Sequence, residues 1–268
     1  MRRFLSLIAA AVLAVSLVTP AMAAGSPVLD RIIESRTVRV GMSGEQPPFS
    51  VRDRDGRLMG LEVDLAKTLA NALAVKLEIV EKPFGELLGA LEKGEVDVVM
   101  SGLAITPERA RDARFIGPYL LSGKSILTTS QTLAQAGEAG QINQASLRLA
   151  ALQNSTSQSF LERQLPQAKL VKVARYDDAI EMLKKGEIDA LVADLPVCVL
   201  AMLQHPDAGF ATLDRPLTVE PVGMAVSAAD PQFASLVRNY LDAIEESGML
   251  ERMRERWLER GEWLERLP

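Results

Sequence analysis

The chain has 268 residues, a formal net charge of −5, one cysteine and one histidine. An acidic balance without a long block of Lys or Arg argues against nucleic acid as a partner. A single cysteine excludes an intramolecular disulfide, and His205 alone excludes a site built from several histidine ligands. We therefore expect no metal and no cofactor.

The first 23 residues have the pattern of a cleavable signal peptide. Arg2 and Arg3 precede an apolar run of about 15 residues, and small residues follow Pro20. The run is shorter than the roughly 20 residues that a membrane span needs. A lipid-anchored export would place a cysteine directly after the signal, whereas Cys198 lies far downstream. The sequence thus predicts a mature protein that is free in the periplasm, without a lipid anchor.

The next segments alternate between strand and helix patterns. We expect a strand over 37–42, a helix over about 61–74, a strand over 76–81 and a helix over about 84–93. Such alternation is typical of the α/β class. Residues 130–146 are the least patterned and are expected to form a surface excursion.

The C-terminal part predicts a short strand over 224–227 and helices over about 231–246 and 249–260. In the last helix Leu250, Met253 and Trp257 recur at spacings of three and four residues, which places them on one apolar face. We expect this helix to dock on the first of two lobes.

An internal echo indicates that the chain has two lobes. Lys-Gly-Glu-Val-Asp begins at Lys93, and Lys-Gly-Glu-Ile-Asp begins at Lys185. In each copy an amphipathic helix ends at a glycine and an apolar strand follows. The motif alone is also a common way to join a helix to a parallel strand, but its placement in both halves favours two similar lobes.

The two echoed strands end at Ser101-Gly102 and at Ala193-Asp194. In open α/β sheets, ligands bind beyond the carboxyl ends of the strands. We therefore expect these two strand ends to face a shared cleft.

Three motifs resemble the polar amino-acid-binding family of periplasmic solute-binding proteins, known as solute-binding protein family 3. They lie at 40–49, 60–66 and 101–109. The resemblance implies a two-lobed type II periplasmic binding fold, with a mainly parallel sheet flanked by helices in each lobe and two hinge crossovers. Lobe 1 would comprise 24–124 and 224–268, and lobe 2 would comprise 125–223.

The resemblance also implies a site for the ligand carboxylate. Arg109 would bind it, with backbone groups at Ser101, Gly102 and Ala104 and with Ser155 and Thr156 of the second lobe. A guanidinium binds a carboxylate through two parallel hydrogen bonds, which agrees with this role. Thr106 would contact the ligand at the start of a helical turn whose free N–H groups favour an anion, or would be a plain helix cap. Arg109 could instead be a solvated helix residue.

The remaining ligand contacts follow from the same resemblance. Asp194 would accept the ligand's α-amino group, or would only cap the helix that begins near Pro196. Phe49 and Phe84 would present aromatic faces to the ligand, or would be core residues. Many binders of basic amino acids carry a tyrosine where this chain has Gln46, and a hydroxyl residue where it has Ala104. These departures make a cationic ligand side chain less well accommodated.

The function implied is the periplasmic solute-binding component of an ABC transporter. It would be a monomer that binds a small amino-acid-like ligand and contacts an inner-membrane permease transiently. One alternative is a cyclohexadienyl dehydratase, which segments 29–35 and 248–258 also resemble. That enzyme needs an acid a few residues beyond Asp194, whereas 195–198 is apolar, so we expect no enzyme. A ligand-binding sensor or adaptor would share every residue above.

Overall fold

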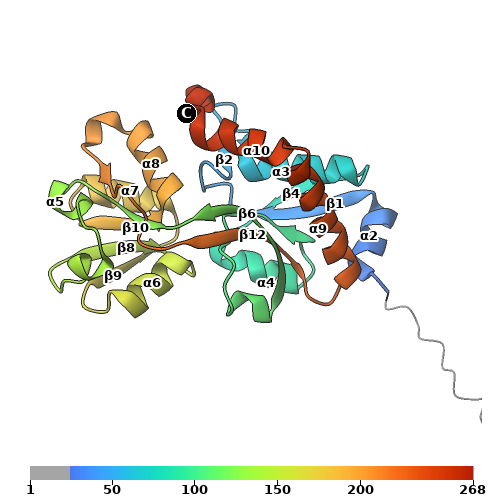
Figure 1. Ribbon diagram of the computed structural model, residues 1–268, viewed down its shortest axis with the longest axis horizontal. Helices are drawn as coiled ribbons and strands as arrows, with labels where there is room; N and C mark the ends of the chain where they lie inside the picture. The colour runs from blue at the N-terminus through green and yellow to red at the C-terminus, as the bar shows by residue number, and fades with distance from the viewer. Residues whose placement is uncertain (1–24, 268) are drawn as a thin grey trace, which may run out of the picture.

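Two five-stranded sheets form two lobes in the computed structural model, which describes residues 25–267 (Figure 1). The spatial order in lobe 1 is β4 (Lys76–Glu81), β1 (Thr37–Met42), β5 (Val98–Val99), β12 (Glu220–Ser227) and β6 (Ala113–Ser122). In lobe 2 it is β11 (Ala211–Thr212), β7 (Lys124–Thr128), β10 (Ala190–Asp194), β8 (Arg148–Leu152) and β9 (Lys169–Val173). The predicted α/β class is confirmed, while the predicted signal peptide at 1–23 lies outside the described residues.

Each sheet is mainly parallel, with one reversed strand. In lobe 1, β12 runs antiparallel to both neighbours, and β4, β1 and β5 are parallel. In lobe 2, β7 runs antiparallel to both neighbours, and β10, β8 and β9 are parallel. The carboxyl ends of β5 and β10 are therefore available to a common cleft.

Helices cover both faces of the sheets. In lobe 1 they are α2 (Pro27–Ser35), α3 (Leu61–Ala72), α4 (Leu87–Glu92), α9 (Pro231–Glu246) and α10 (Met249–Arg254), with a π-helix at Glu255–Glu259 and 3-10 helices at Phe84–Glu86, Arg109–Arg111 and Gly261–Arg266. In lobe 2 they are α5 (Gln131–Ala134), α6 (Thr156–Gln164), α7 (Tyr176–Lys184) and α8 (Leu195–Gln204), with 3-10 helices at Ala139–Ile142 and Pro206–Ala208. A small hairpin joins β2 (Val51–Arg52) to β3 (Leu58–Met59). Within 25–267, every helix is too short or too polar to cross a membrane.

The crossing between the lobes is double-stranded. β6 and β12 pair along their whole length, with Ala113 opposite Ser227 at one end and Ser122 opposite Glu220 at the other. Both strands carry the chain from one lobe to the other (Figure 1). The strand predicted over 224–227 is longer for this reason and begins at Glu220. At Gly123 a Cβ atom would lie 1.9 Å from the carbonyl oxygen of Thr218, so the two crossing segments approach too closely for any other residue.

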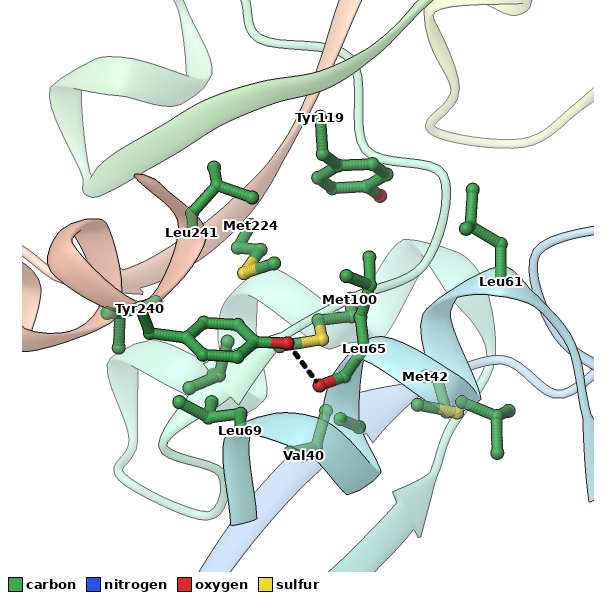
Figure 2. Close-up of a cluster of buried hydrophobic side chains, with 14 of the residues drawn as sticks. Val40, Met42, Leu61, Leu65, Leu69, Met100, Tyr119, Met224, Tyr240 and Leu241 are labelled. Carbon is green, nitrogen blue, oxygen red and sulfur yellow. Dashed lines mark hydrogen bonds between the residues drawn. The ribbon is translucent and has the colours of Figure 1, made fainter. Parts of the chain in front are cut away.

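The core of lobe 1 lies between its sheet and the helices α3 and α9. Figure 2 shows Val40, Met100 and Met224 of the sheet region packed against Leu65 of α3 and Tyr240 of α9. The Tyr240 hydroxyl donates a hydrogen bond of 2.8 Å to the carbonyl oxygen of Leu65, which satisfies its one polar group. The predicted range of α9 is confirmed.

The C-terminal helix docks on lobe 1, as its apolar spacing predicts. Leu250 and Trp257 are buried in the lobe 1 core, and Met253 packs against it. The regular α-helix ends at Arg254, earlier than expected, and continues as the π-helix that carries Trp257.

The echoed segments have the same local structure in both lobes. Gly94 and Gly186 follow α4 and α7 with φ angles of +69° and +68°, the left-handed conformation that glycine adopts without strain. The aspartates of the echo, Asp97 and Asp189, each accept a hydrogen bond from the backbone N–H and the guanidinium of an arginine on the neighbouring strand. The interpretation of the echo as two lobes of one design is thereby supported.

Candidate functional site

The two lobes contact each other across the cleft through polar groups. Arg163 of α6 forms an ion pair of 3.1 Å with Glu108, and Arg175, just before α7, forms one of 2.6 Å with Glu45. Arg109 Nη2 donates to the carbonyl oxygen of Asn154 at 3.3 Å. The structure therefore has its lobes closed on each other around the strand ends.

Arg109 is a half-buried cation between the lobes. Its Nη1 donates to the carbonyl oxygen of Ala104 at 2.9 Å, and its guanidinium lies 5.6 Å from the centre of the Phe84 ring. Within residues 25–267 it forms no ion pair. Burial lowers the pKa of Arg109, while the carboxylates of Glu220 and Asp194 oppose that shift. Two carbonyl oxygens therefore hold the guanidinium of Arg109 in position, and its positive charge has no direct counter-ion among the described residues.

The turn before Arg109 holds it in place. The Thr106 hydroxyl accepts a hydrogen bond of 3.3 Å from the backbone N–H of Arg109, the first residue of the 3-10 helix, and so ties the preceding turn to that helix. Thr106 also lines the neighbouring pocket, so its position is compatible with contact to a ligand as well.

A pocket of 280 Å³ lies beside Arg109 and is formed by both lobes. It is lined by Thr106, Glu108, Arg109, Asn154, Ser155, Thr156, Ser159, Phe160, Arg163, Gln164 and Glu220. The first turn of α6 belongs to this wall, and the N–H groups of its first two residues, Thr156 and Ser157, have no intrahelical acceptors. An anion bound near Arg109 would find these donors in addition to the guanidinium.

Ser155 and Thr156 have different roles at this helix start. The Ser155 hydroxyl accepts from the backbone N–H of Gln158 at 3.2 Å and donates to the carbonyl oxygen of Leu152 at 2.6 Å, so it serves as a helix cap. The Thr156 hydroxyl donates to Glu220 Oε2 at 2.8 Å. Of the two hydroxyls, that of Thr156 is therefore the one directed at a charged group of the cleft.

Asp194 lies at the end of β10, as predicted, but its carboxylate is already paired. Lys124 Nζ lies 2.6 Å from Asp194 Oδ1 and 2.9 Å from Glu220 Oε2. The Lys124 side chain is 2% exposed, whereas those of Asp194 and Glu220 are 13% and 17% exposed. Asp194 makes no capping hydrogen bond to α8. The cluster of Lys124, Asp194 and Glu220, here named the acidic cluster, thus presents carboxylate edges in front of a buried ammonium.

On the lobe 1 side, a buried carboxylate supports the loop after β5. Glu62 accepts hydrogen bonds from the backbone N–H of Gly102 at 2.7 Å and from the hydroxyl of Tyr119. Burial raises the pKa of Glu62 to about 7, and the two hydrogen bonds limit that rise. Ser101 donates to Gln46 Oε1 at 2.8 Å. The backbone N–H of Gly102 and the hydroxyl of Ser101 therefore already have acceptors within lobe 1, and these hydrogen bonds fix the position of the loop.

The predicted aromatic contacts differ in their surroundings. Phe84 is 8% exposed, belongs to a buried hydrophobic cluster and lies under the guanidinium of Arg109. Phe49 is 1% exposed, belongs to the lobe 1 core and packs behind Gly102. Ala104 is also buried and bridges to Val222 of β12.

Tyr176 is an aromatic residue of the cleft that the sequence patterns did not identify. It begins α7 in lobe 2 and is 6% exposed. Burial raises the pKa of Tyr176 well above its usual value, and the charges of Asp194 and Glu220 add to the rise. Its phenol is therefore a neutral group that faces the acidic cluster.

Sequence reasoning also missed Lys124 and Glu220. Lys124 carries the only charge in the run from Leu120 to Ser130, and a lysine within such a buried strand is a signal of a buried ion pair. Glu220 has no such signal, because the sequence alone did not extend β12 to the crossing. Within the described part of the chain, no group of three or more His, Cys, Asp or Glu residues could hold a metal ion.

Two mainly parallel α/β lobes, a double crossover and a charged cleft between them define the two-lobed periplasmic binding proteins of type II. The family model of bacterial extracellular solute-binding proteins, family 3, matches residues 38–260. The chain therefore belongs to this family, and the resemblance found in its motifs is confirmed.

Known relatives include both binding proteins and an enzyme. The chain is 29% identical to the cyclohexadienyl dehydratase of Pseudomonas aeruginosa, over 86% of each chain. It is 26% identical to the ABC transporter arginine-binding protein 1 of Escherichia coli, over 82% of this chain and 90% of that protein. The crystal structure of an ancestral amino acid-binding protein, a precursor of cyclohexadienyl dehydratase, matches with a TM-score of 0.80 and 32% identity, over 86% of this chain and 99% of that one.

Proposed function

We propose that the protein is the periplasmic solute-binding component of an ABC transporter for a small amino-acid-like ligand. The observation that carries this proposal is the separation of charge in the closed cleft. Arg109 has no ion-pair partner among the described residues, and the acidic cluster opposite carries two carboxylates for one ammonium. A zwitterionic ligand would place its carboxylate at Arg109 and its ammonium group at the acidic cluster.

In this proposal the ligand carboxylate binds Arg109 and the N–H groups at the start of α6. The ring of Phe84 packs against the ligand. The ammonium binds the exposed edges of Asp194 and Glu220. Because Arg109 belongs to lobe 1 and the other charged groups to lobe 2 and the crossing, a bound ligand favours the closed arrangement. Excluding water on closure strengthens both contacts. A permease in the inner membrane would then recognise the closed form transiently.

The setting of this proposal follows from the sequence and the family. A signal peptide at 1–23 would direct the chain to the periplasm, where the mature protein would act as a monomer. A sensor or adaptor that presents the same closed form to a receptor uses the same cleft, and a pull-down with inner-membrane ABC permeases would separate the two.

The test is thermal unfolding of ligand-stripped mature protein with each of the twenty amino acids and with prephenate. Selective binding to the folded state must raise the melting temperature. We expect at least one amino acid to raise it, and the Arg109→Ala variant to lose that response. No response to any amino acid would overturn the proposal.

A dehydratase is the second candidate, and Glu220 is the observation that favours it. The segment after Asp194 supplies no acid, but Glu220 is a carboxylate that reaches the cleft from β12. Glu220 already accepts hydrogen bonds from Thr156 and Lys124, so its contacts support a binding role better than proton transfer to a leaving group. Turnover of prephenate to phenylpyruvate, abolished in Glu220→Gln, would establish the enzyme instead.

A further inference from the structure

The charged groups around the pocket beside Arg109 are balanced before any ligand enters. Glu108 of this pocket is paired with Arg163. Asp194 and Glu220 share Lys124, which leaves one negative charge in the acidic cluster. Arg109 supplies one positive charge. Over the charged residues that line this pocket, together with Lys124 and Asp194, the sum is zero, and one charge of each sign is unmatched.

We propose that Lys124 makes the cleft selective for amino acids with uncharged side chains, an inference that rests on the proposed function. A zwitterion uses both unmatched charges and leaves none. A third charge on the ligand side chain would be enclosed in this pocket without a counter-ion, because the other two charged residues that line it, Glu108 and Arg163, are already paired with each other. Enclosing an unpaired charge is strongly unfavourable.

Lys124 is the residue that sets this balance because of its position. Its ammonium lies behind both carboxylates and is almost completely buried, so it neutralises one of them without occupying the pocket wall. Without Lys124 the groups around this pocket would carry one net negative charge and would suit a ligand with an additional positive charge. Without the charge of Glu220 they would carry one net positive charge and would suit an acidic ligand.

The experiment is isothermal titration calorimetry of mature protein with amino acids of matched shape. The pairs are citrulline and arginine, norleucine and lysine, and glutamine and glutamate. In the unmodified protein we expect the neutral member of a pair to bind about tenfold tighter or more. A charged member that binds as tightly as its neutral counterpart would overturn the inference and leave the proposed function intact.

Two variants test the role of Lys124 in the charge balance, and we expect them to shift ligand preference in opposite directions. Lys124→Gln should raise the affinity ratio of cationic to neutral member by about tenfold, and Glu220→Gln should raise the ratio of glutamate to glutamine by a similar factor. Lys169→Gln, which removes an exposed lysine of β9, should leave both ratios unchanged. If Lys124→Gln does not fold, Glu220→Gln still decides the matter. Unchanged ratios in folded variants would contradict the inference, whereas no binding of any amino acid would overturn the proposed function as well.

Discussion

The strand end of lobe 1 rests on a buried carboxylate, whereas that of lobe 2 rests on a buried ammonium. Glu62 is fully buried and holds the loop after β5 through Gly102. Lys124 is 2% exposed and holds the end of β10 through Asp194. The two lobes share the echoed helix, turn and strand, which form the scaffold of each lobe. They differ in the buried charged residue that supports the strand end at the cleft.

This comparison separates residues that build a lobe from residues that distinguish one lobe from the other. Asp97 and Asp189 make equivalent contacts to Arg39 and Arg148, which tie neighbouring strands together. Both directly precede the amino ends of their strands, β5 and β10, at the opposite end from the cleft. Glu62 and Lys124, in contrast, carry side chains of opposite kind, and each supports one wall of the cleft.

The largest expected effect is on ligand affinity, when the cation of lobe 1 is removed. Arg109→Ala leaves a ligand carboxylate enclosed without its partner, so we expect affinity for the amino acid found in the thermal screen to fall by about 3 kcal/mol or more. Isothermal titration calorimetry measures this change. Arg111→Ala, an exposed arginine of the same turn, serves as the control. Equal affinities of the two variants would show that the carboxylate binds elsewhere.

The echoed aspartates should differ in their effect on stability. Asp97 is 2% exposed and is paired with both Arg31 and Arg39, so Asp97→Asn should lower the free energy of unfolding by about 3 kcal/mol. Asp189 is 29% exposed and is paired with Arg148 only, so Asp189→Asn should cause a smaller loss. Urea unfolding of both variants makes the comparison, and a larger loss for Asp189→Asn would contradict it.

Glu62, which supports the loop after β5 in lobe 1, should make the stability of the protein depend on pH. Burial raises the pKa of Glu62 from 4.5 to about 7, so between these values the folded state retains a proton that the unfolded state has lost. The free energy of unfolding therefore falls as the pH rises, by roughly 2 kcal/mol between about pH 5 and pH 8. Glu62→Gln should lack this part of the decrease. If denaturant unfolding gives the same pH dependence for both proteins, the Glu62 assignment is wrong.

The smallest expected effect is at the helix start in lobe 2. Ser155 caps α6 with its hydroxyl, so Ser155→Ala should lower the free energy of unfolding by about 1 kcal/mol. Ser146→Ala, at an exposed position outside the helices and strands, should have little effect. A loss in Ser155→Ala no larger than in Ser146→Ala would mean that the cap contributes nothing measurable.

Much of the fold could be predicted because it depends on local patterns. The ranges of β1 and β4 match their predictions, as does that of α9, since each has a clear apolar period and a boundary signal. The short strand predicted over 224–227 was too short, because its first residues are polar or irregular and become a strand only by pairing with β6. Pairing between distant segments has no local signal.

The candidate site divides in the same way. Arg109, Thr156 and Asp194 lie at the cleft where their motifs place them, whereas Phe49 lies in the core and Ser155 uses its hydroxyl as a cap. Whether these residues bind ligand is a prediction that the experiments above test.

By itself, the sequence determined the α/β class, the two lobes and the strand ends that face each other, because apolar periodicity and turn residues act over a few neighbouring positions. Only the tertiary structure decided which charges meet. Lys124 and Glu220 are far apart in the sequence, yet the double crossover brings their side chains to 2.9 Å. Electrostatic pairing depends on distance in space, and that distance exists only after the chain has crossed between the lobes twice.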